Sequence, residues 1–184
     1  KLLVNMGKGK KSTYYELLKD SSLKLYIDID DYYKTSEELQ NSRVDRIKKI
    51  INKLQSHNYF LFDGSVKVDN RNDRKVYKLS FRIIMPDYIF ESGEAVREAV
   101  KTFNLDFDDS VYKPRNKHQL IRLPYTSKEG DSRVFRLIRN AKHNPVRIDV
   151  LFNQYFSENS VMAPGGEFEK FTAEEQKNIK NGTI

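Results

Sequence analysis

Hydrophobic and polar residues alternate over residues 23–30, which read LKLYIDID. A period of two is typical of a strand that buries one face. From Ser36, taken as the N-cap, the segment EELQNSRVDRIKKIINKLQ places its aliphatic residues at helical spacing. The two patterns predict a strand that ends in carboxylates, followed by an amphipathic helix.

The rest of the chain contains further strand and helix patterns. In order, we expect a helical turn over 14–18, strands over 59–66 and 76–85 joined by VDNRNDRK, a helix GEAVREAVKTF opened by Ser92, a loop over 105–112, paired strands over 120–125 and 133–139 about a turn at 129–131, and a helix RIDVLFNQYF after Pro145. This order indicates an α/β or α+β domain with a mixed or antiparallel sheet. We expect a basic arm over 1–22, a domain over 23–157, and a linker-like tail over 158–184 that leads to a further domain.

The composition indicates a folded chain. Of the 184 residues, 38% are hydrophobic and 12% are aromatic, which is too many for a disordered tail. The absence of Cys excludes disulfides and cysteine-based metal sites, and favours a reducing compartment. No apolar run approaches the roughly 20 residues of a membrane span, and there is no signal peptide. We therefore expect an intracellular protein that is not secreted and has no membrane partner.

The positive charge is concentrated in one segment. The formal net charge is +7, yet residues 113–147 alone hold ten basic and two acidic residues. Hydrophobic residues interleave with the bases, as in strands that hold basic side chains on a rigid sheet. Such a field attracts a phosphate-bearing partner, a nucleotide or a nucleic acid. The alternative is a solvated basic surface without a partner.

Several common motifs are excluded. The segment GKGKKS lacks the contiguous Gly-Lys-Ser/Thr and the upstream glycine of a phosphate-binding loop. His57, His118 and His143 do not have the spacing of zinc ligands. The basic segment lacks the aromatic signature of the common single-strand RNA-binding sheet. The carboxylates are left as the candidate chemistry.

Asp28 and Asp30 lie two apart on the first predicted strand, so their side chains leave the same face. Two such carboxylates repel each other unless a cation lies between them, and oxygen ligands suit Mg²⁺ or Mn²⁺. Removal of one carboxylate is therefore expected to stabilise the metal-free protein. The simpler alternative is that the strand ends here and an Asp caps a turn. With a distant carboxylate from the segment Asp108-Asp109-Ser110-Val111-Tyr112 and basic residues at Arg122 and Lys128, the set has the parts needed for two-metal nucleotidyl transfer.

These residues resemble the motifs of the archaeo-eukaryotic primases, in particular the primase domain of poxvirus and giant-virus primase–helicases and the primase-polymerases. That family reads Asp-x-Asp/Glu at a strand end, then Ser-x-His on a later strand, then an Asp in D-x-x-V-Y that leads to R-L-x-x-x-x-K. The corresponding segments here are Asp28-Ile29-Asp30, Lys78-Leu79-Ser80-Phe81-Arg82, Asp108-Asp109-Ser110-Val111-Tyr112 and Arg122-Leu123-Pro124-Tyr125-Thr126-Ser127-Lys128. The four motifs occur in the family's order, and the resemblance covers roughly residues 23–157.

The resemblance implies roles for the carboxylates. Asp28 and Asp30 correspond to metal ligands, and Asp108 corresponds to the third catalytic carboxylate. Asp109 is the less favoured choice because it is one place off the pattern. The implied cofactor is Mg²⁺ or Mn²⁺.

The resemblance also implies nucleotide contacts and one departure. Ser80, Arg122 and Lys128 correspond to residues that contact the triphosphate, and Lys78 assists. Arg82 stands where the family has His. An Arg offers a donor fork to phosphate but is permanently charged and cannot titrate. Reduced, altered or absent catalysis is one reading of this departure.

By this resemblance the chain is expected to have a two-lobed fold with an RNA-recognition-like sheet, and to act as a DNA primase or primase-polymerase. Its expected partners are a single-stranded DNA template, nucleoside triphosphates and a helicase domain in the same longer chain. A viral source would place it at a replication site in the host-cell cytoplasm. Two alternatives remain open: a nucleic-acid-binding module with weakened catalysis, and a metal-dependent nuclease.

Overall fold

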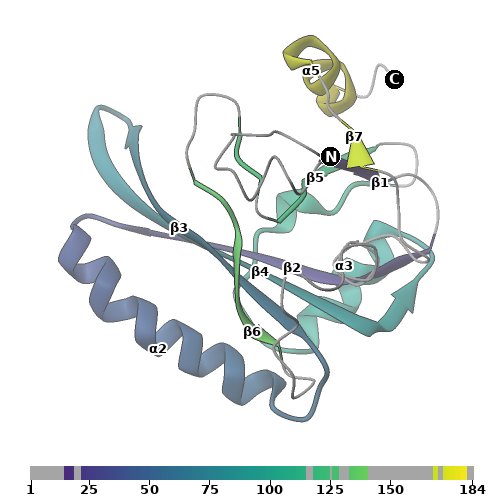
Figure 1. Cartoon of the computed structure of the whole chain (residues 1–184), viewed down its shortest axis with the longest axis horizontal. Helices are drawn as coiled ribbons and strands as arrows, with labels where there is room; N and C mark the ends of the chain where they lie inside the picture. Colours follow the sequence, from purple (N-terminus) through teal and green to yellow (C-terminus); the bar gives the residue numbers. More distant parts are fainter. Residues whose placement is uncertain are drawn as a thin grey trace, which may run out of the picture.

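The computed structural model of the chain describes residues 15–18, 22–114, 118–124, 126–128, 133–140, 168–169 and 172–181. Within these residues it is a mixed α/β structure with two antiparallel sheets (Figure 1). The larger sheet has the order β2-β4-β3-β6, and the smaller has the order β5-β1-β7. The strands are β1 (Tyr15–Leu18), β2 (Leu23–Tyr33), β3 (Phe60–Arg71), β4 (Arg74–Phe90), β5 (Gln119–Arg122), β6 (Arg136–Asn140) and β7 (Phe168–Glu169), and the helices are α2 (Ser36–Leu54), α3 (Gly93–Lys101) and α5 (Ala173–Asn181).

The core lies where α2 and α3 pack on β2 and β4. Ile27 and Ile29 of β2 are buried, as are Ile50 and Leu54 of α2. Because successive side chains of a strand point to opposite faces, burial of Ile27 and Ile29 directs Asp28 and Asp30 to the face away from the helices. The alternation in the sequence therefore sets the side on which the carboxylates lie.

Helix termini follow the expected chemistry, with one shift. The N-cap of α2 is Thr35, not Ser36, and Thr35 forms a capping box with Glu38. The Thr35 hydroxyl accepts from the backbone N–H of Glu38 at 3.1 Å, and the Glu38 carboxylate accepts from the backbone N–H of Thr35 at 3.3 Å. Ser92 caps α3, as predicted. The reciprocal pair of bonds explains the shift, because Ser36 has no Glu or Gln three residues later.

The β3–β4 hairpin is longer than the sequence pattern indicates. Its backbone ladder continues to Arg71 paired with Arg74, so the polar segment expected as a connection is mostly strand. The turn is confined to Asn72 and Asp73, whose φ angles are 49° and 60°. Asn and Asp are the non-glycine residues that adopt this left-handed conformation most readily.

Other sequence expectations need correction. Residues 15–18 form a strand and not a helical turn, because β1 pairs with β5 and β7. The strands expected over 120–125 and 133–139 both exist, but they do not pair with each other. β5 belongs to the smaller sheet, whereas β6 pairs with β3.

The expected arm and tail also contribute to the folded structure. Strand β1 belongs to the expected arm, and β7 belongs to the expected tail, where α5 follows it. Both strands lie in the smaller sheet, and α5 packs near β5. The helix expected after Pro145 and the Pro164-Gly165-Gly166 segment lie outside the described residues. None of the helices in the described part of the chain is long and apolar enough to cross a membrane.

Candidate functional site

One cavity brings together all eight residues singled out in the sequence. It has a volume of about 530 Å³ and is lined by residues of β1, β2, β4, β5 and α5, by residues of the segment 108–111, and by Lys128, Arg133 and Phe135. The eight are Asp28, Asp30, Lys78, Ser80, Arg82, Asp108, Arg122 and Lys128. Segments as much as 100 residues apart in sequence therefore converge, which the order of the motifs alone did not determine.

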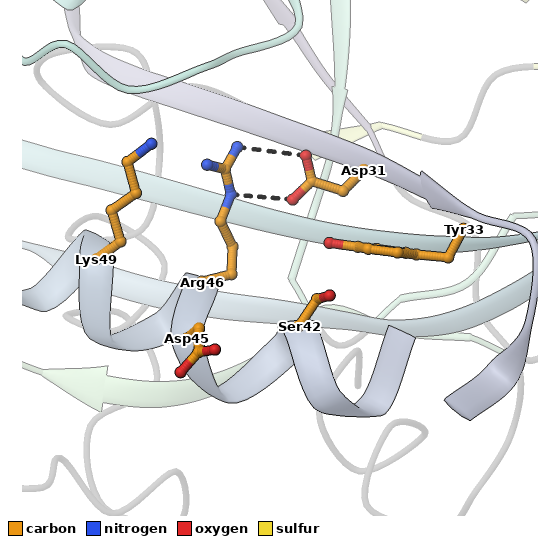
Figure 2. A pocket seen from close by; sticks show the side chains of 6 residues that line it. All are labelled: Asp31, Tyr33, Ser42, Asp45, Arg46 and Lys49. Atoms are coloured by element: carbon orange, nitrogen blue, oxygen red, sulfur yellow. Dashed lines mark hydrogen bonds and ion pairs between the residues drawn. The ribbon is translucent and has the colours of Figure 1, made fainter. Parts of the chain in front are cut away.

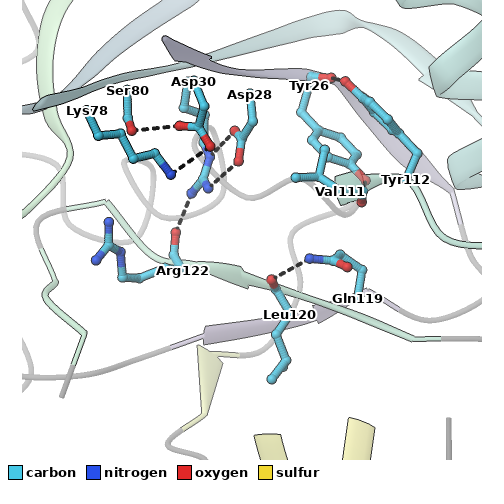
Figure 3. A network of polar contacts seen from close by, with 11 residues as sticks. Tyr26, Asp28, Asp30, Lys78, Ser80, Val111, Tyr112, Gln119, Leu120 and Arg122 are labelled. Carbon is cyan, nitrogen blue, oxygen red and sulfur yellow. Dashed lines mark hydrogen bonds and ion pairs between the residues drawn. The ribbon is translucent and has the colours of Figure 1, made fainter. Parts of the chain in front are cut away.

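The two strand carboxylates lie directly opposite polar residues of β4 (Figure 3). Asp28 is paired in register with Arg82, and Asp30 is paired with Ser80. Arg82 donates to both oxygens of Asp28, from Nε at 2.7 Å and from Nη2 at 2.9 Å. The Ser80 hydroxyl donates to Asp30 at 2.7 Å, and the Lys78 ammonium lies 2.8 Å from the other oxygen of Asp30. Each carboxylate thus has its own cation.

Arg82 connects the two sheets. Its Nη1 donates to the backbone carbonyl of Arg122 on β5 at 2.6 Å. Its guanidinium carbon lies 4.5 Å from the ring centre of Phe135, and that of Arg122 lies 5.0 Å from the same ring centre. Gly64 leaves room for this ring, since a Cβ at Gly64 would lie 2.8 Å from a Phe135 ring carbon. Stacking of guanidinium groups on an aromatic ring is favourable and fixes their planes.

The electrostatics of both cations follow from their carboxylate partners. Burial alone would lower the pKa of Arg82, but the charge of Asp28 and the hydrogen bonds to it raise the pKa above its ordinary value. Burial also opposes the charge of Lys78, and the hydrogen bond to Asp30 and its charge raise the pKa of Lys78. Both side chains remain cationic at neutral pH.

Asp108 reaches the cavity on a loop that is fastened to β2. The backbone N–H of Asp108 donates to the carbonyl of Asp28 at 2.7 Å. The Tyr26 hydroxyl donates to the carbonyl of Val111 at 3.0 Å, and the Tyr112 hydroxyl donates to the carbonyl of Tyr26 at 2.6 Å (Figure 3). Burial raises the pKa of both tyrosine hydroxyls, so both remain protonated donors. The bonds to the carbonyls of Asp28 and Tyr26 can form because β2 is an edge strand of its sheet.

The neighbouring carboxylates point elsewhere. Asp109 is exposed and pairs with Arg97 of α3, and the Arg97 hydrogen bond holds the pKa of Asp109 below its ordinary value. Asp31 lies on the helix-facing side of β2, where Arg46 of α2 is 2.9 Å from its carboxylate (Figure 2). A separate shallow pocket of about 290 Å³ lies there between β2 and α2. Of the two adjacent aspartates at 108 and 109, Asp108 is therefore the one that faces the larger cavity.

The charge of the cavity differs from the sequence expectation. Among the described residues, five basic and three acidic side chains line it, which gives these side chains a formal net charge of +2. Asp28 and Asp30 are not two repelling carboxylates, because Arg82 and Lys78 neutralise them. The side chain of Asp108 accepts from the backbone N–H and hydroxyl of Ser110, at 3.0 and 2.7 Å. Both oxygens of Asp28 and of Asp30, and Oδ1 of Asp108, are thus already engaged by donors.

This arrangement does not fit a divalent metal ion as it stands. Within the described residues, no three Asp, Glu, His or Cys side chains are grouped so that they could hold a metal ion. Both oxygens of Asp28 face a guanidinium, and an ion at that position would meet a like charge. The site is arranged to receive anionic groups in its present state.

Sequence reasoning did not select several residues of this site. Arg133 was counted in the basic segment but was not distinguished from its neighbours, although it lines the cavity with Phe135. Tyr26 and Tyr112 flank the motifs, and aromatic residues next to each carboxylate motif are the only sequence signal for them. Gln176 of α5 also lines the cavity, and nothing in the local sequence indicates it.

The chain was compared with known proteins. Neither the protein-family models nor the curated protein sequences gave a match. The functional interpretation of the cavity therefore depends on its own geometry and on the resemblance of its motifs.

Proposed function

We propose that the cavity binds the triphosphate of a nucleoside triphosphate and that the domain is a DNA primase or primase-polymerase. The observation that carries the proposal is the convergence of the eight motif residues on one cavity of net positive charge. Four short motifs in a given order are a weak signal individually. Their meeting in space supports a common role.

The cavity has the chemistry for polyphosphate recognition. Arg122 and Lys128 line the same cavity as the carboxylates, from β5 and from the segment after it. Arginine donates to phosphate oxygens through a planar fork, and lysine acts as a point charge. The ammonium of Lys78, which has three N–H donors, extends this donor set toward Asp30.

The proposal includes the remaining implications of the resemblance. In this proposal the two antiparallel sheets form the two lobes of a primase fold, and the template is single-stranded DNA. Primases of this type use Mg²⁺ or Mn²⁺, which supply charge stabilisation for phosphoryl transfer. Asp28, Asp30 and Asp108 are the residues to which the resemblance assigns these ions. A helicase domain in the same chain, and a viral replication site in the host-cell cytoplasm, belong to the same proposal.

A second candidate is a nucleotide- or nucleic-acid-binding module without efficient catalysis. It is favoured by the bidentate ion pair between Arg82 and Asp28, which engages a carboxylate assigned to catalysis. This module would still bind a triphosphate, because Arg122 and Lys128 remain in the cavity. Binding and synthesis therefore have to be measured separately.

The deciding experiment is template-dependent dinucleotide synthesis with each nucleotide type, in Mg²⁺ and in Mn²⁺. The parent is expected to form product, and Asp30→Asn and Asp108→Asn are each expected to abolish it. Asp31→Asn and Asp106→Asn serve as controls, because both carboxylates contact Arg46 on the helix side of β2. Product from both site variants, or equal loss in both controls, contradicts the assignment. Binding without synthesis in the parent supports the second candidate.

Nucleotide affinity provides an independent measurement. Arg122→Ala and Lys128→Ala are each expected to weaken triphosphate binding by roughly 10- to 150-fold, because a charge-assisted contact contributes about 1.5–3 kcal/mol. Lys101→Ala is the matched control, since Lys101 is exposed on α3 and pairs with Glu98. Unchanged affinity in both cavity variants would mean that the triphosphate binds elsewhere.

A further inference from the structure

Arg82 is the most completely enclosed cation in the cavity. Its side chain is 5% exposed, whereas that of Lys78 is 22% exposed. Three of its nitrogens are engaged, two by Asp28 and one by the carbonyl of Arg122. Its guanidinium is further held against the Phe135 ring. These contacts come from β2 and β5, so Arg82 bridges the two sheets while it is paired with Asp28.

We propose that Arg82 is a built-in counter-ion that takes the place of a divalent cation at Asp28. A guanidinium is permanently charged, so no change of pH in the physiological range releases the carboxylate. A divalent cation at Asp28 would have to displace two charge-assisted hydrogen bonds and would lie next to the displaced positive charge. Asp28 is thus closed to divalent cations in the free protein.

The ion pair between Arg82 and Asp28 contributes to the positive charge of the cavity by neutralising one of its carboxylates. Asp28 and Asp30 are each neutralised by a cation of the chain, and the other charged side chains among the described residues of the cavity are Asp108, Arg122, Lys128 and Arg133. An anionic ligand therefore meets a positive field without any metal ion. This rests on the proposed function in one respect, the identity of the anion as a nucleotide triphosphate. The role of Arg82 toward Asp28 does not depend on it.

The test measures Mn²⁺ binding in the absence of nucleotide, from the decrease in the electron paramagnetic resonance signal of free Mn²⁺. Arg82→Gln removes the charge but keeps a long polar side chain and adds no strong metal ligand. We expect this variant to bind Mn²⁺ on the order of tenfold to a hundredfold more tightly than the parent, because one adjacent positive charge is lost. Arg82→Lys keeps the charge without the fork and is expected to show a smaller gain.

Two controls assign the effect to Asp28. The double variant Arg82→Gln with Asp28→Asn is expected to lose the gain. Arg97→Gln makes the same change in net charge at an exposed pair on α3 and is expected to bind Mn²⁺ as the parent does. If Arg82→Gln is unstable without metal, a rise in its melting temperature with Mn²⁺ that the double variant lacks supports the proposal.

The proposal is overturned if Arg82→Gln and Arg82→Lys bind Mn²⁺ no more tightly than the parent. It is also overturned if the double variant keeps the gain, or if the nucleotide-free parent binds Mn²⁺ tightly through Asp28. If Arg82→Gln does not fold even with Mn²⁺, the Arg82→Lys measurement decides. No nucleotide is present, so these results are independent of whether the protein synthesises primers.

Discussion

Replacement of Asp28 by Asn tests the ion pair at the centre of the cavity. The substitution keeps the size of the side chain and removes its charge. Arg82, 5% exposed, then has no carboxylate partner, and one of its two bonds to position 28, at 2.7 and 2.9 Å, is broken or weakened. The expected result is a loss of stability, opposite to the gain expected for a pair of repelling carboxylates.

The magnitude follows from the burial of the pair. Removing one partner of a buried ion pair costs about 3–5 kcal/mol. Asn keeps one oxygen that accepts from Arg82, and the Asp28 side chain is 14% exposed, so a loss of about 2–4 kcal/mol is expected. For a domain of this size about 1 kcal/mol changes the melting temperature by roughly 2–4 °C, which gives a decrease of about 4–16 °C.

The assay is thermal and urea unfolding in the presence of EDTA, which excludes any effect of bound metal. Asp109→Asn is the matched control, since it removes the same charge from an exposed pair with Arg97 and is expected to leave the melting temperature unchanged. An Asp28→Asn protein that is as stable as the parent, or more stable, would refute the reasoning. In the parent, the Asp28 carboxylate would then be repelled by Asp30 at least as strongly as it is stabilised by Arg82.

Three further predictions concern the surroundings of the site. Gly64→Ala places a methyl group 2.8 Å from a ring carbon of Phe135 and is expected to lower both the melting temperature and the affinity for nucleotide. An unchanged melting temperature would show that the Phe135 ring moves aside without a loss of stability. Single-stranded DNA is expected to bind weakly and with strong salt dependence. The double variant Lys128→Ala with Arg133→Ala should reduce the slope of log affinity against log salt concentration by about 0.7 for each DNA phosphate that is no longer neutralised. An unchanged slope would exclude both side chains from DNA binding. Burial outweighs the Arg46 charge and raises the pKa of the Asp31 carboxyl above its ordinary value of 3.8. The folded state therefore binds the Asp31 proton more tightly than the unfolded state does. The resulting contribution to folding stability is present below pH 3.8 and is lost as the pH rises through the raised pKa. Unfolding measured across the acidic pH range should show that Asp31→Asn lacks this pH-dependent loss of stability. Identical pH profiles of stability for Asp31→Asn and the parent would contradict the prediction.

The sequence by itself determined the local features of the site. Alternation over residues 23–30 placed Asp28 and Asp30 on one face, because a strand repeats every two residues. The aliphatic spacing of 36–54 and the cap at Ser92 predicted α2 and α3, because these signals act within a few residues of the chain. The four motifs selected eight of the residues that line the cavity, although not Arg133, Phe135 or Gln176.

Tertiary structure decided the pairing of these elements. The strands β5 and β6 were both expected from their composition, yet they joined different sheets. Strand β1 has only four residues and is defined by its partners β5 and β7, which are about 100 and 150 residues away in sequence. A pattern of four residues has too few positions to distinguish a strand from a helical turn, and long-range backbone pairing makes the choice.

Tertiary structure also decided the charge state of the site. Asp28 and Arg82 are 54 residues apart, and only the register of β2 against β4 sets them opposite each other. A shift of one residue in that register would direct the two side chains to opposite faces and leave two unpaired carboxylates on β2. Sequence could identify the acidic and basic residues, but whether they repel, attract a metal or neutralise each other depends on distances of a few ångströms. Those distances are fixed by strand pairing and by packing against Phe135, and so they exist only in the folded chain.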